Sequence, residues 1–167
     1  RSAYSSMDAW PHESTKRLRV GSFEVGFSEN PHSTASGKAF LAFCDDSEIE
    51  TYFDERRLDA VTPNTITDWD QLMHEFGEIR AHGVAFDREE SDTGIAGLGA
   101  VIIGSHGEPV GAYAAAMPVA RFDEAREAVS AALLKAGDDA SRALRYRGEY
   151  PPKQPRARNP KKPFVSR

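Results

Sequence analysis

The sequence predicts an α+β fold in which an antiparallel β-sheet is flanked by helices. Two apolar stretches, 98–103 and 110–119, flank the sequence GSHGEP, whose glycines suit a turn between antiparallel strands. Helical patterns lie before and after this strand pair and do not alternate with single strands along the chain. That order favours an antiparallel sheet over a doubly wound parallel one.

Two short helices are expected in the first half of the chain. Residues 35–44 follow Ser33 and Thr34, either of which can cap a helix, and they place Ala39, Phe40 and Phe43 on one face. A second short helix is predicted within 44–58, capped by one of the acidic residues at 45–46. Residues 61–67, VTPNTIT, are typical of a loop because Pro and Asn favour turns.

The clearest helical pattern follows this loop. Apolar residues recur there at helical spacing, at Leu72, Met73, Phe76 and Ile79. Thr67 with Asp70 resembles a capping box, and Gly83 is expected to end the helix. A last amphipathic helix is predicted over 121–144, with four residues facing inward: Phe122, Ala125, Val129 and Leu133.

Residues 84–90 show the alternation of a strand. Val84 and Phe86 would lie on one face, with Asp87 and Glu89 on the other and Glu90 opposite them. The acidic face is either an exposed strand end or the wall of a pocket. The pattern alone leaves both interpretations open.

Length and composition fit one globular domain with a tail. We place the domain at 1–150 and a basic, proline-rich, disordered tail at 151–167. The tail holds six of the 21 basic residues and no acidic one, so 1–150 carries 15 basic against 26 acidic residues. A body that acidic disfavours nucleic-acid binding, because phosphate contacts dominate such affinity. The tail is either a solvated extension or a contact for nucleic acid or an acidic partner.

The expected location is the cytoplasm. No apolar run approaches the roughly 20 residues of a membrane helix, and no signal peptide is visible. The single cysteine, Cys44, excludes an internal disulfide and fits a reducing compartment. We therefore expect no contact with a membrane.

Motifs for common chemistries do not match. The stretch before Lys38 lacks the first glycine of a phosphate-binding loop, and Ala39 replaces its Ser or Thr. The glycines at 97 and 99 lack the third glycine of a dinucleotide fingerprint, so we expect them to thin a strand where something approaches its backbone closely. Ser36 lacks the G-x-S-x-G elbow of a hydrolase.

The histidines give no sign of a metal or catalytic site. The five lie mostly in predicted loops or on polar helix faces without zinc-ligand spacing, and His74 and His82 suggest one solvated face. We therefore expect no catalytic residue, no cofactor and no metal.

Three segments together resemble a known family. They are PHSTASGKAFLAF at 31–43, the stretch 61–102 from VTPNTIT to GLGAVI, and GEPVGAYAAAMPVARF at 107–122. In this order and spacing, across residues 15–145, they look like the effector-binding domain of IclR-type bacterial transcription regulators. The resemblance implies a GAF-like or profilin-like antiparallel sheet flanked by helices. It also implies dimers or tetramers, and DNA binding only through an N-terminal winged helix-turn-helix.

That helix-turn-helix has no counterpart in this sequence. Because the chain begins with Arg1 rather than Met, we expect a fragment or a processed protein, with the first part of the sensing domain missing or diverged. Residues 1–30 match the family only weakly.

The resemblance also implies a ligand site. The positions that match the family's pocket are Ala35, Ser36, Asp87, Ile95, Gly97, Ala114 and Ala116. The helix that begins near Ala35 would offer its N-terminus to a small carboxylate, and Lys38 would be structural or peripheral. A buried Asp87 would repel a carboxylate beside it and accept from a hydroxyl, amide or amine.

This sequence departs from better-known members in two places. Ala114 and Ala116 stand where serine can occur, and Gly97 stands where cysteine can occur. We therefore expect an enlarged cavity and an effector larger or more apolar than a 2-oxo acid. Three alternatives stay open: small strand residues that only accommodate packing, an enzyme that uses Asp87 as general base, and a protein that acts through partners by its basic tail.

Overall fold

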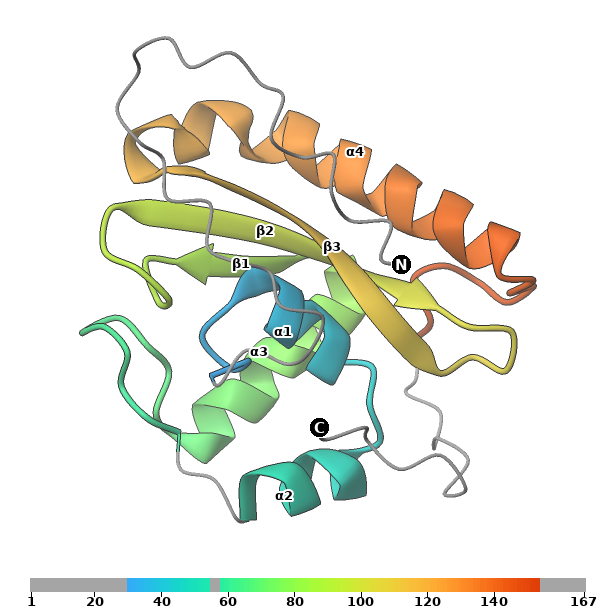
Figure 1. Cartoon of the computed structure of the whole chain (residues 1–167), viewed down its shortest axis with the longest axis horizontal. Helices are drawn as coiled ribbons and strands as arrows, with labels where there is room; N and C mark the ends of the chain where they lie inside the picture. The colour runs from blue at the N-terminus through green and yellow to red at the C-terminus, as the bar shows by residue number, and fades with distance from the viewer. Residues whose placement is uncertain (1–29, 55–57, 154–167) are drawn as a thin grey trace, which may run out of the picture.

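The structure is a computed structural model that describes residues 30–54 and 58–153. Within these ranges three helices come first: α1 (Ala35–Leu41), α2 (Asp46–Asp54) and α3 (Trp69–His82). The strands β1 (Ala85–Arg88), β2 (Ile95–Ile103) and β3 (Pro109–Pro118) follow, and after a short 3-10 turn the chain ends its core in α4 (Phe122–Ala143). This arrangement, drawn in Figure 1, confirms the predicted α+β class.

The three strands form one antiparallel sheet in the order β1-β2-β3. Its register sets residues of all three strands side by side. Asp87 pairs with Gly97, and Gly97 pairs with Ala116, so these three residues form one row across the sheet. Gly99 lies between Ala85 and Ala114 in the adjacent row on the same face.

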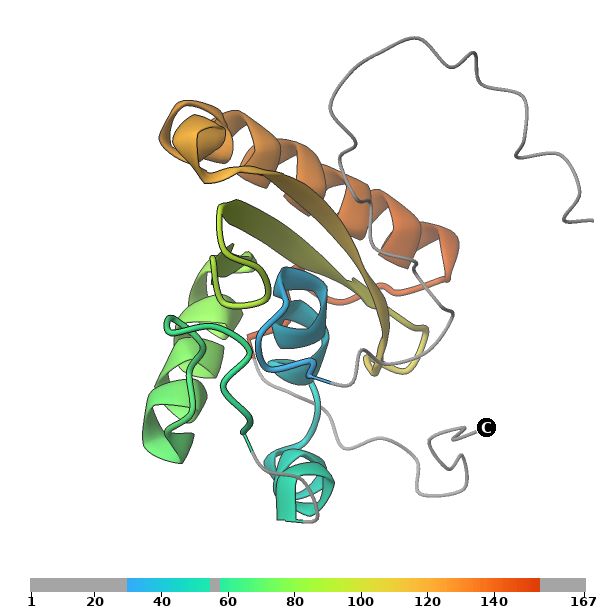
Figure 2. The ribbon, with the colours of Figure 1, turned by 60° about the vertical axis from the view of Figure 1, so that its left-hand side comes forward.

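Helices cover both faces of the sheet, as Figure 2 shows, with α4 on one side and α1 and α3 on the other. Under α4 lies an apolar cluster of buried residues: Val84, Leu98, Ala100 and Leu133. The larger core lies on the opposite side, where Val101 and Ile103 of β2 meet buried residues of α1 and α3. Alternation along β2 therefore supplies apolar side chains to both layers.

Helix ends follow the expected chemistry with one shift. Gly83 ends α3 with a φ of 79°, a left-handed conformation that favours glycine, as predicted. The N-cap of α3 is Asp68, whose side chain accepts from the Gln71 N–H at 2.9 Å, so the predicted cap at Thr67 was wrong by one residue.

The segment after α4 folds back onto the body. The Tyr150 hydroxyl donates to the Val101 carbonyl at 2.7 Å, in a notch where a methyl group on Gly137 would collide with it. Pro151 contacts the turn at Gly83, and Pro152 is buried. Packed structure thus continues past the predicted boundary at 150, and the tail from 154 onward lies outside the described residues.

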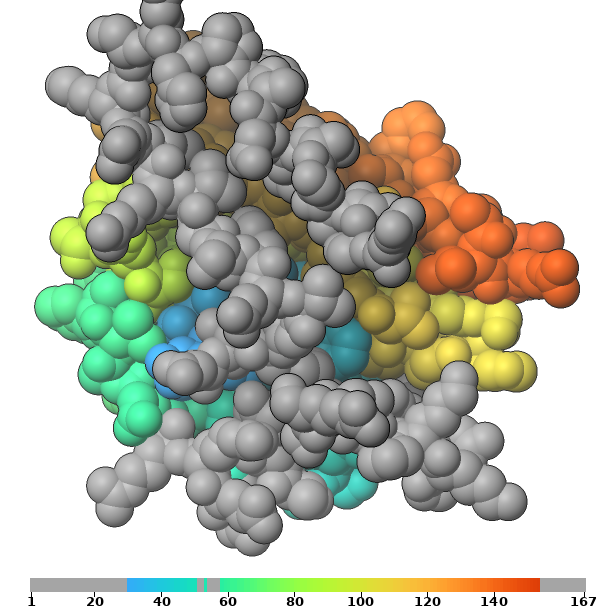
Figure 3. Space-filling model, in the orientation of Figure 1, coloured from blue at the N-terminus to red at the C-terminus, as the bar shows by residue number. Residues whose placement is uncertain are grey.

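Several segments lie at the surface of the molecule. The connection between β2 and β3 and the C-terminal end of α4 reach the surface on the face drawn in Figure 3. His74 and His82 are exposed, as predicted. Within 30–54 and 58–153, no helix combines the length and the apolar character needed to cross a membrane.

Candidate functional site

The site begins at the start of α1. Thr34 caps the helix, and its hydroxyl accepts from the Gly37 N–H at 3.1 Å. Ser33, the other predicted cap, instead donates to the Asn30 carbonyl at 2.9 Å. A methyl group on Gly37 would lie 2.6 Å from the Pro31 Cα, so the loop before α1 requires a glycine there.

The first turn of α1 lies directly on β2. A Cβ on Gly97 would lie 3.2 Å from the Ala35 Cβ and 3.3 Å from the Asp87 Cβ. A Cβ on Gly99 would lie 2.7 Å from the Ala35 carbonyl carbon and would overlap its oxygen. The prediction that something approaches these glycines closely is confirmed, and α1 itself is what approaches.

This contact corrects the expectation of an enlarged cavity at Gly97. The space beside the Gly97 Cα is narrow, because a Cβ there would already lie within 3.3 Å of both Ala35 and Asp87. The helix has only seven residues, and the carbonyl of Ala35 and the amide of Ser36 both face Gly99. The expected carboxylate-binding site at the N-terminus of α1 is therefore partly occupied by β2.

The structure brings the predicted ligand residues to one side of the sheet. Asp87, Gly97 and Ala116 share a row, and Ile95 and Ala114 lie on the same face by alternation. Ala35 and Ser36 belong to the helix that packs on this face. Asp87 and Gly97 are buried, whereas Ala114 and Ala116 are exposed. The open part of the face is on β3.

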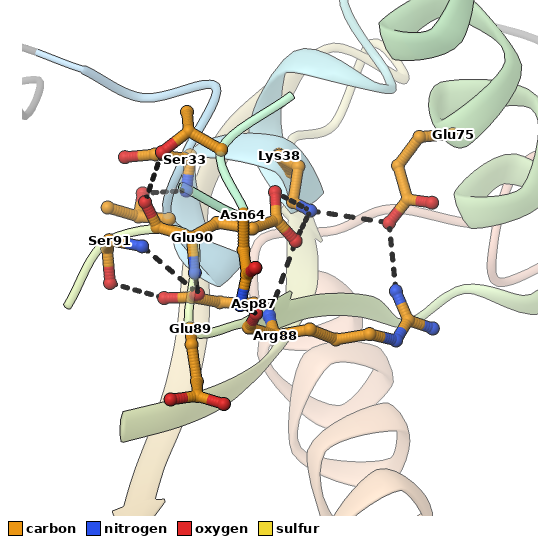
Figure 4. A network of polar contacts seen from close by, with 12 residues as sticks. Ser33, Lys38, Asn64, Glu75, Asp87, Arg88, Glu89, Glu90 and Ser91 are labelled. Carbon is orange, nitrogen blue, oxygen red and sulfur yellow. Dashed lines mark hydrogen bonds and ion pairs between the residues drawn. The ribbon is translucent and has the colours of Figure 1, made fainter. Parts of the chain in front are cut away.

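Asp87 already has partners in the chain. Its Oδ1 accepts from the Glu90 N–H at 2.7 Å and the Ser91 N–H at 3.2 Å, and its Oδ2 accepts from the Ser91 hydroxyl (Figure 4). The carboxylate therefore holds the turn between β1 and β2. A ligand is therefore not needed to satisfy the buried Asp87, because three donors of the turn do so.

The predicted faces of Glu89 and Glu90 were also wrong. The strand ends at Arg88, and Glu89 has a φ of 61°, so alternation stops there. The Glu89 carboxylate accepts from the Gly94 N–H at 2.7 Å and closes the turn. Glu90 is buried and points toward α1, on the same side of the sheet as Asp87.

Lys38 is fully buried at the centre of a polar network, drawn in Figure 4. Its ammonium donates to both carboxylate oxygens of Glu90 at 2.7 Å and to Glu75 Oε1 of α3 at 3.3 Å. Burial raises the pKa of Glu90, and the charge and hydrogen bonds of Lys38 oppose this rise. The structural role expected for Lys38 fits this geometry, and the peripheral one does not.

Two threonines of the loop before α3 hold the same turn. The Thr62 hydroxyl donates to the Glu89 carbonyl at 2.6 Å, and the Thr65 hydroxyl donates to the Glu90 carbonyl at 2.7 Å. Sequence reasoning missed these contacts and the Glu90 partner of Lys38. The repeated threonines of VTPNTIT were the available signal, since hydroxyls in a loop often bond to backbone.

His32 lies in the loop before α1 and contacts the core. It is buried, its Nε2 lies 3.1 Å from the Asp59 carbonyl, and its ring packs edge-on against Phe53. Because a carbonyl only accepts, Nε2 carries the proton, and the buried Nδ1 has no hydrogen-bond partner among the described residues. Burial lowers the pKa of His32, although the Asp59 carbonyl opposes this.

Metal chemistry has no support in the described ranges. No group of three or more His, Cys, Asp or Glu side chains there could hold a metal ion. The charged side chains of the site bond to one another or to the backbone, as the contacts of Asp87, Glu90 and Lys38 show.

Comparison with known proteins decides the family. The family described as "Bacterial transcriptional regulator IclR C-terminal" matches residues 12–142. The chain belongs to this family. The predicted IclR-type effector-binding domain is thereby confirmed, and with it the effector-sensing part of a transcription regulator.

Relatives of this IclR-type domain are named as regulators. The chain is 40% identical over 119 residues to HTH-type transcriptional regulator Rv1719 of Mycobacterium tuberculosis, covering 71% of this chain and 45% of that protein. It is 32% identical over 120 residues to BhcR of Paracoccus denitrificans, covering 71% and 43%. The solved IclR structure from Thermotoga maritima matches with a TM-score of 0.67 at 37% identity, covering 70% and 47%.

The IclR-type chain thus spans less than half the length of these relatives. Their names point away from enzymatic activity, and the alternative of an enzyme with Asp87 as general base has no support among them.

Proposed function

We propose that this domain binds a small organic effector on the sheet face covered by α1 and passes the change in shape to a DNA-binding domain outside this chain. The observation that carries the proposal is the gathering of all seven candidate ligand residues on that face or on α1. By linkage, the effector must bind one conformation better than another to produce a signal.

The chemistry of the face favours a ligand larger or more apolar than a 2-oxo acid. Ala114 and Ala116 offer no hydroxyls, and both are exposed, whereas the space over Gly97 is taken. The ligand would therefore lie toward β3, beside Ala35 and Ser36. One protein of this fold, 20% identical with a TM-score of 0.59, is a double mutant of the inducer-binding domain of PobR from Acinetobacter in complex with 3-hydroxybenzoic acid. That acid is a useful probe.

The rest of the proposal follows the family. The regulator would be a cytoplasmic homodimer or tetramer, would contact DNA only through a domain outside this chain, and would catalyse no reaction. The names of the relatives support a regulator.

A thermal-shift screen of the purified chain tests the ligand site. The panel holds small aliphatic acids, aromatic acids including 3-hydroxybenzoate, phenols and amides. A ligand at 100 times its Kd adds about 2.7 kcal/mol, and roughly 2–4 °C per kcal/mol is expected at this chain length. One chemical class should therefore raise the Tm by several degrees.

Two phenylalanine variants make the screen specific. Ala116→Phe fills the exposed part of the face and should abolish the shift, whereas Ala132→Phe on the exposed side of α4 should retain it. Asp87→Ala is a poorer control, because it also removes the cap of the β1–β2 turn. A shift that survives Ala116→Phe would contradict this site, and a panel without any shift would contradict the sensor.

A further inference from the structure

We propose that Lys38 is a positioning residue for the ligand site: its ammonium ties the turn that Asp87 caps to α1, which carries Ala35 and Ser36. This inference rests on the proposed function only in taking this face of the sheet as a ligand site. In the described part of the chain, the polar partners of the Lys38 ammonium are Glu90 and Glu75 and no candidate ligand residue, so we argue its effect through Glu90.

Glu90 is held at both of its ends. Its backbone N–H donates to Asp87 at 2.7 Å, and its carboxylate accepts twice from Lys38 at 2.7 Å. Asp87 and Lys38 are therefore joined by a single residue, although they come from β1 and from α1. Figure 4 shows this path from Asp87 through Glu90 to Lys38.

Lys38 has no hydrogen-bonding capacity to spare. An ammonium has three hydrogens, and its three acceptors are the two oxygens of Glu90 and Oε1 of Glu75. Glu75 lies on α3 and also faces Arg88 at 3.7 Å. The ammonium thus fixes three elements at once: α1, the β1–β2 turn and α3.

Because both side chains are buried, Glu90 requires Lys38 as its partner. Lys38 is fully buried and Glu90 nearly so, with side-chain exposures of 0% and 4%. A buried carboxylate that loses its cation must take a proton or move to water. If Glu90 moves, it pulls its own N–H away from Asp87, and the row Asp87–Gly97–Ala116 loses its defined edge.

Hydrogen bonds from a second loop also hold the turn between β1 and β2, and they lead to a competing expectation. Thr62 and Thr65 hold the carbonyls of Glu89 and Glu90 from the loop before α3. If these bonds suffice, the turn keeps its shape without Lys38. If Lys38 is the positioning residue, the amides bonded to Asp87 open when it is removed.

Amide hydrogen exchange followed by NMR separates these cases without any ligand. The full chain is compared as wild type, as Lys38→Met and as Leu98→Ala, a control that damages the opposite, α4-covered face. In Lys38→Met the Glu90 and Ser91 amides should exchange about tenfold faster or more, relative to core amides of the same variant. In Leu98→Ala that ratio should stay as in the wild type.

A double variant covers the case in which Lys38→Met does not fold. Lys38→Met/Glu90→Met replaces the buried pair by apolar side chains, an exchange that is often neutral for stability. The amides of residue 90 and Ser91 should still exchange faster, because the ion pair between the turn and α1 is gone. A stable double variant with wild-type protection at both amides would overturn the inference, and so would equal loss of protection in Leu98→Ala.

Ligand binding then tests whether the Lys38–Glu90 ion pair affects the ligand site. A compound that raises the Tm of the wild type should bind the double variant about tenfold more weakly, because binding needs the preformed edge. Equal affinity for both proteins would overturn the positioning role and leave the proposed sensor intact. A screen without hits would count against the sensor and leave the exchange result to decide on Lys38.

Discussion

The sheet face under α4 is filled by apolar side chains, whereas the face under α1 and α3 also carries glycines and buried ions. Under α4, Leu98, Ala100 and Leu133 pack by size and shape. Under α1, the backbone of Ala35 lies against Gly99, and Lys38 is buried with Glu90. Apolar packing tolerates exchange among similar side chains, while close backbone contact and buried charge accept few replacements. The face that carries the candidate site is therefore the less replaceable one.

The largest expected effect is the loss of the buried cation. Lys38→Met should lower the free energy of unfolding by about 3–5 kcal/mol, because it leaves the buried Glu90 without its partner. Urea unfolding measures this. Lys135→Met, which removes an exposed pair with Asp139, should show no measurable change. Similar losses in both variants would remove the distinction between buried and surface pairs.

The α4 face should respond to volume instead. Leu98→Ala is expected to cost about 2–5 kcal/mol, whereas Leu98→Met should cost less than about 1.5 kcal/mol because it keeps the volume. The same urea experiment gives both values. If Leu98→Met cost as much as Lys38→Met, the two faces would be equally demanding and the comparison would fail.

The glycine contact of the α1 face should show a smaller loss. Gly99→Ala places a methyl group against the Ala35 carbonyl, and such overpacking costs about 1–3 kcal/mol. Gly77 lies on the exposed side of α3, and no described residue outside its own turn of helix comes within 4 Å of a Cβ there, so Gly77→Ala should stabilise by about 0.5–1 kcal/mol. Thermal unfolding should move the Tm in opposite directions, and a shift of the same sign would contradict the close approach of α1.

The smallest effect concerns pH. The pKa of His32 is lowered from 6.5 by burial, so the unfolded chain takes up a proton at a pH where the folded chain does not. The contribution of neutral His32 to stability is complete above 6.5 and falls as the pH drops below it. Glu90, whose pKa burial raises, contributes in the opposite direction.

A difference between variants isolates the histidine. Between about pH 7.5 and about pH 5.5 the wild type should lose more stability than His32→Gln, which keeps a donor for the Asp59 carbonyl. Urea midpoints at both pH values give the difference. Equal losses would show that His32 does not titrate differently on folding.

Local patterns predicted the elements well, because periodicity, caps and glycine turns act within a few residues. Gly83 and the strand pair around the GSHGEP turn are examples. The shift from Thr67 to Asp68 arose because both residue types cap helices. The left-handed conformation of Glu89 could not be predicted for a different reason. Such a conformation favours glycine, and nothing in the sequence marks it at Glu89.

The candidate site was predictable only in part. Alternation and the family resemblance placed Asp87, Gly97 and Ala116 on one face, and the register sets them in one row. The link between Lys38 and Glu90 spans 52 positions, so no local pattern reports it. Burial of His32 depends likewise on Asp59 and Phe53, which come from later segments.

The return of the chain after α4 sets limits for anyone who trims this domain. The helix ends at Ala143, but the Tyr150 hydroxyl fills the notch at Gly137 and covers the Val101 carbonyl of the central strand. Cutting at the end of the helix would leave that carbonyl bare and open a gap between α4 and β2. Pro151 would also leave Gly83, where α3 turns into β1. A fluorescent reporter joined after Lys153 would keep this contact between the returning chain and the helix.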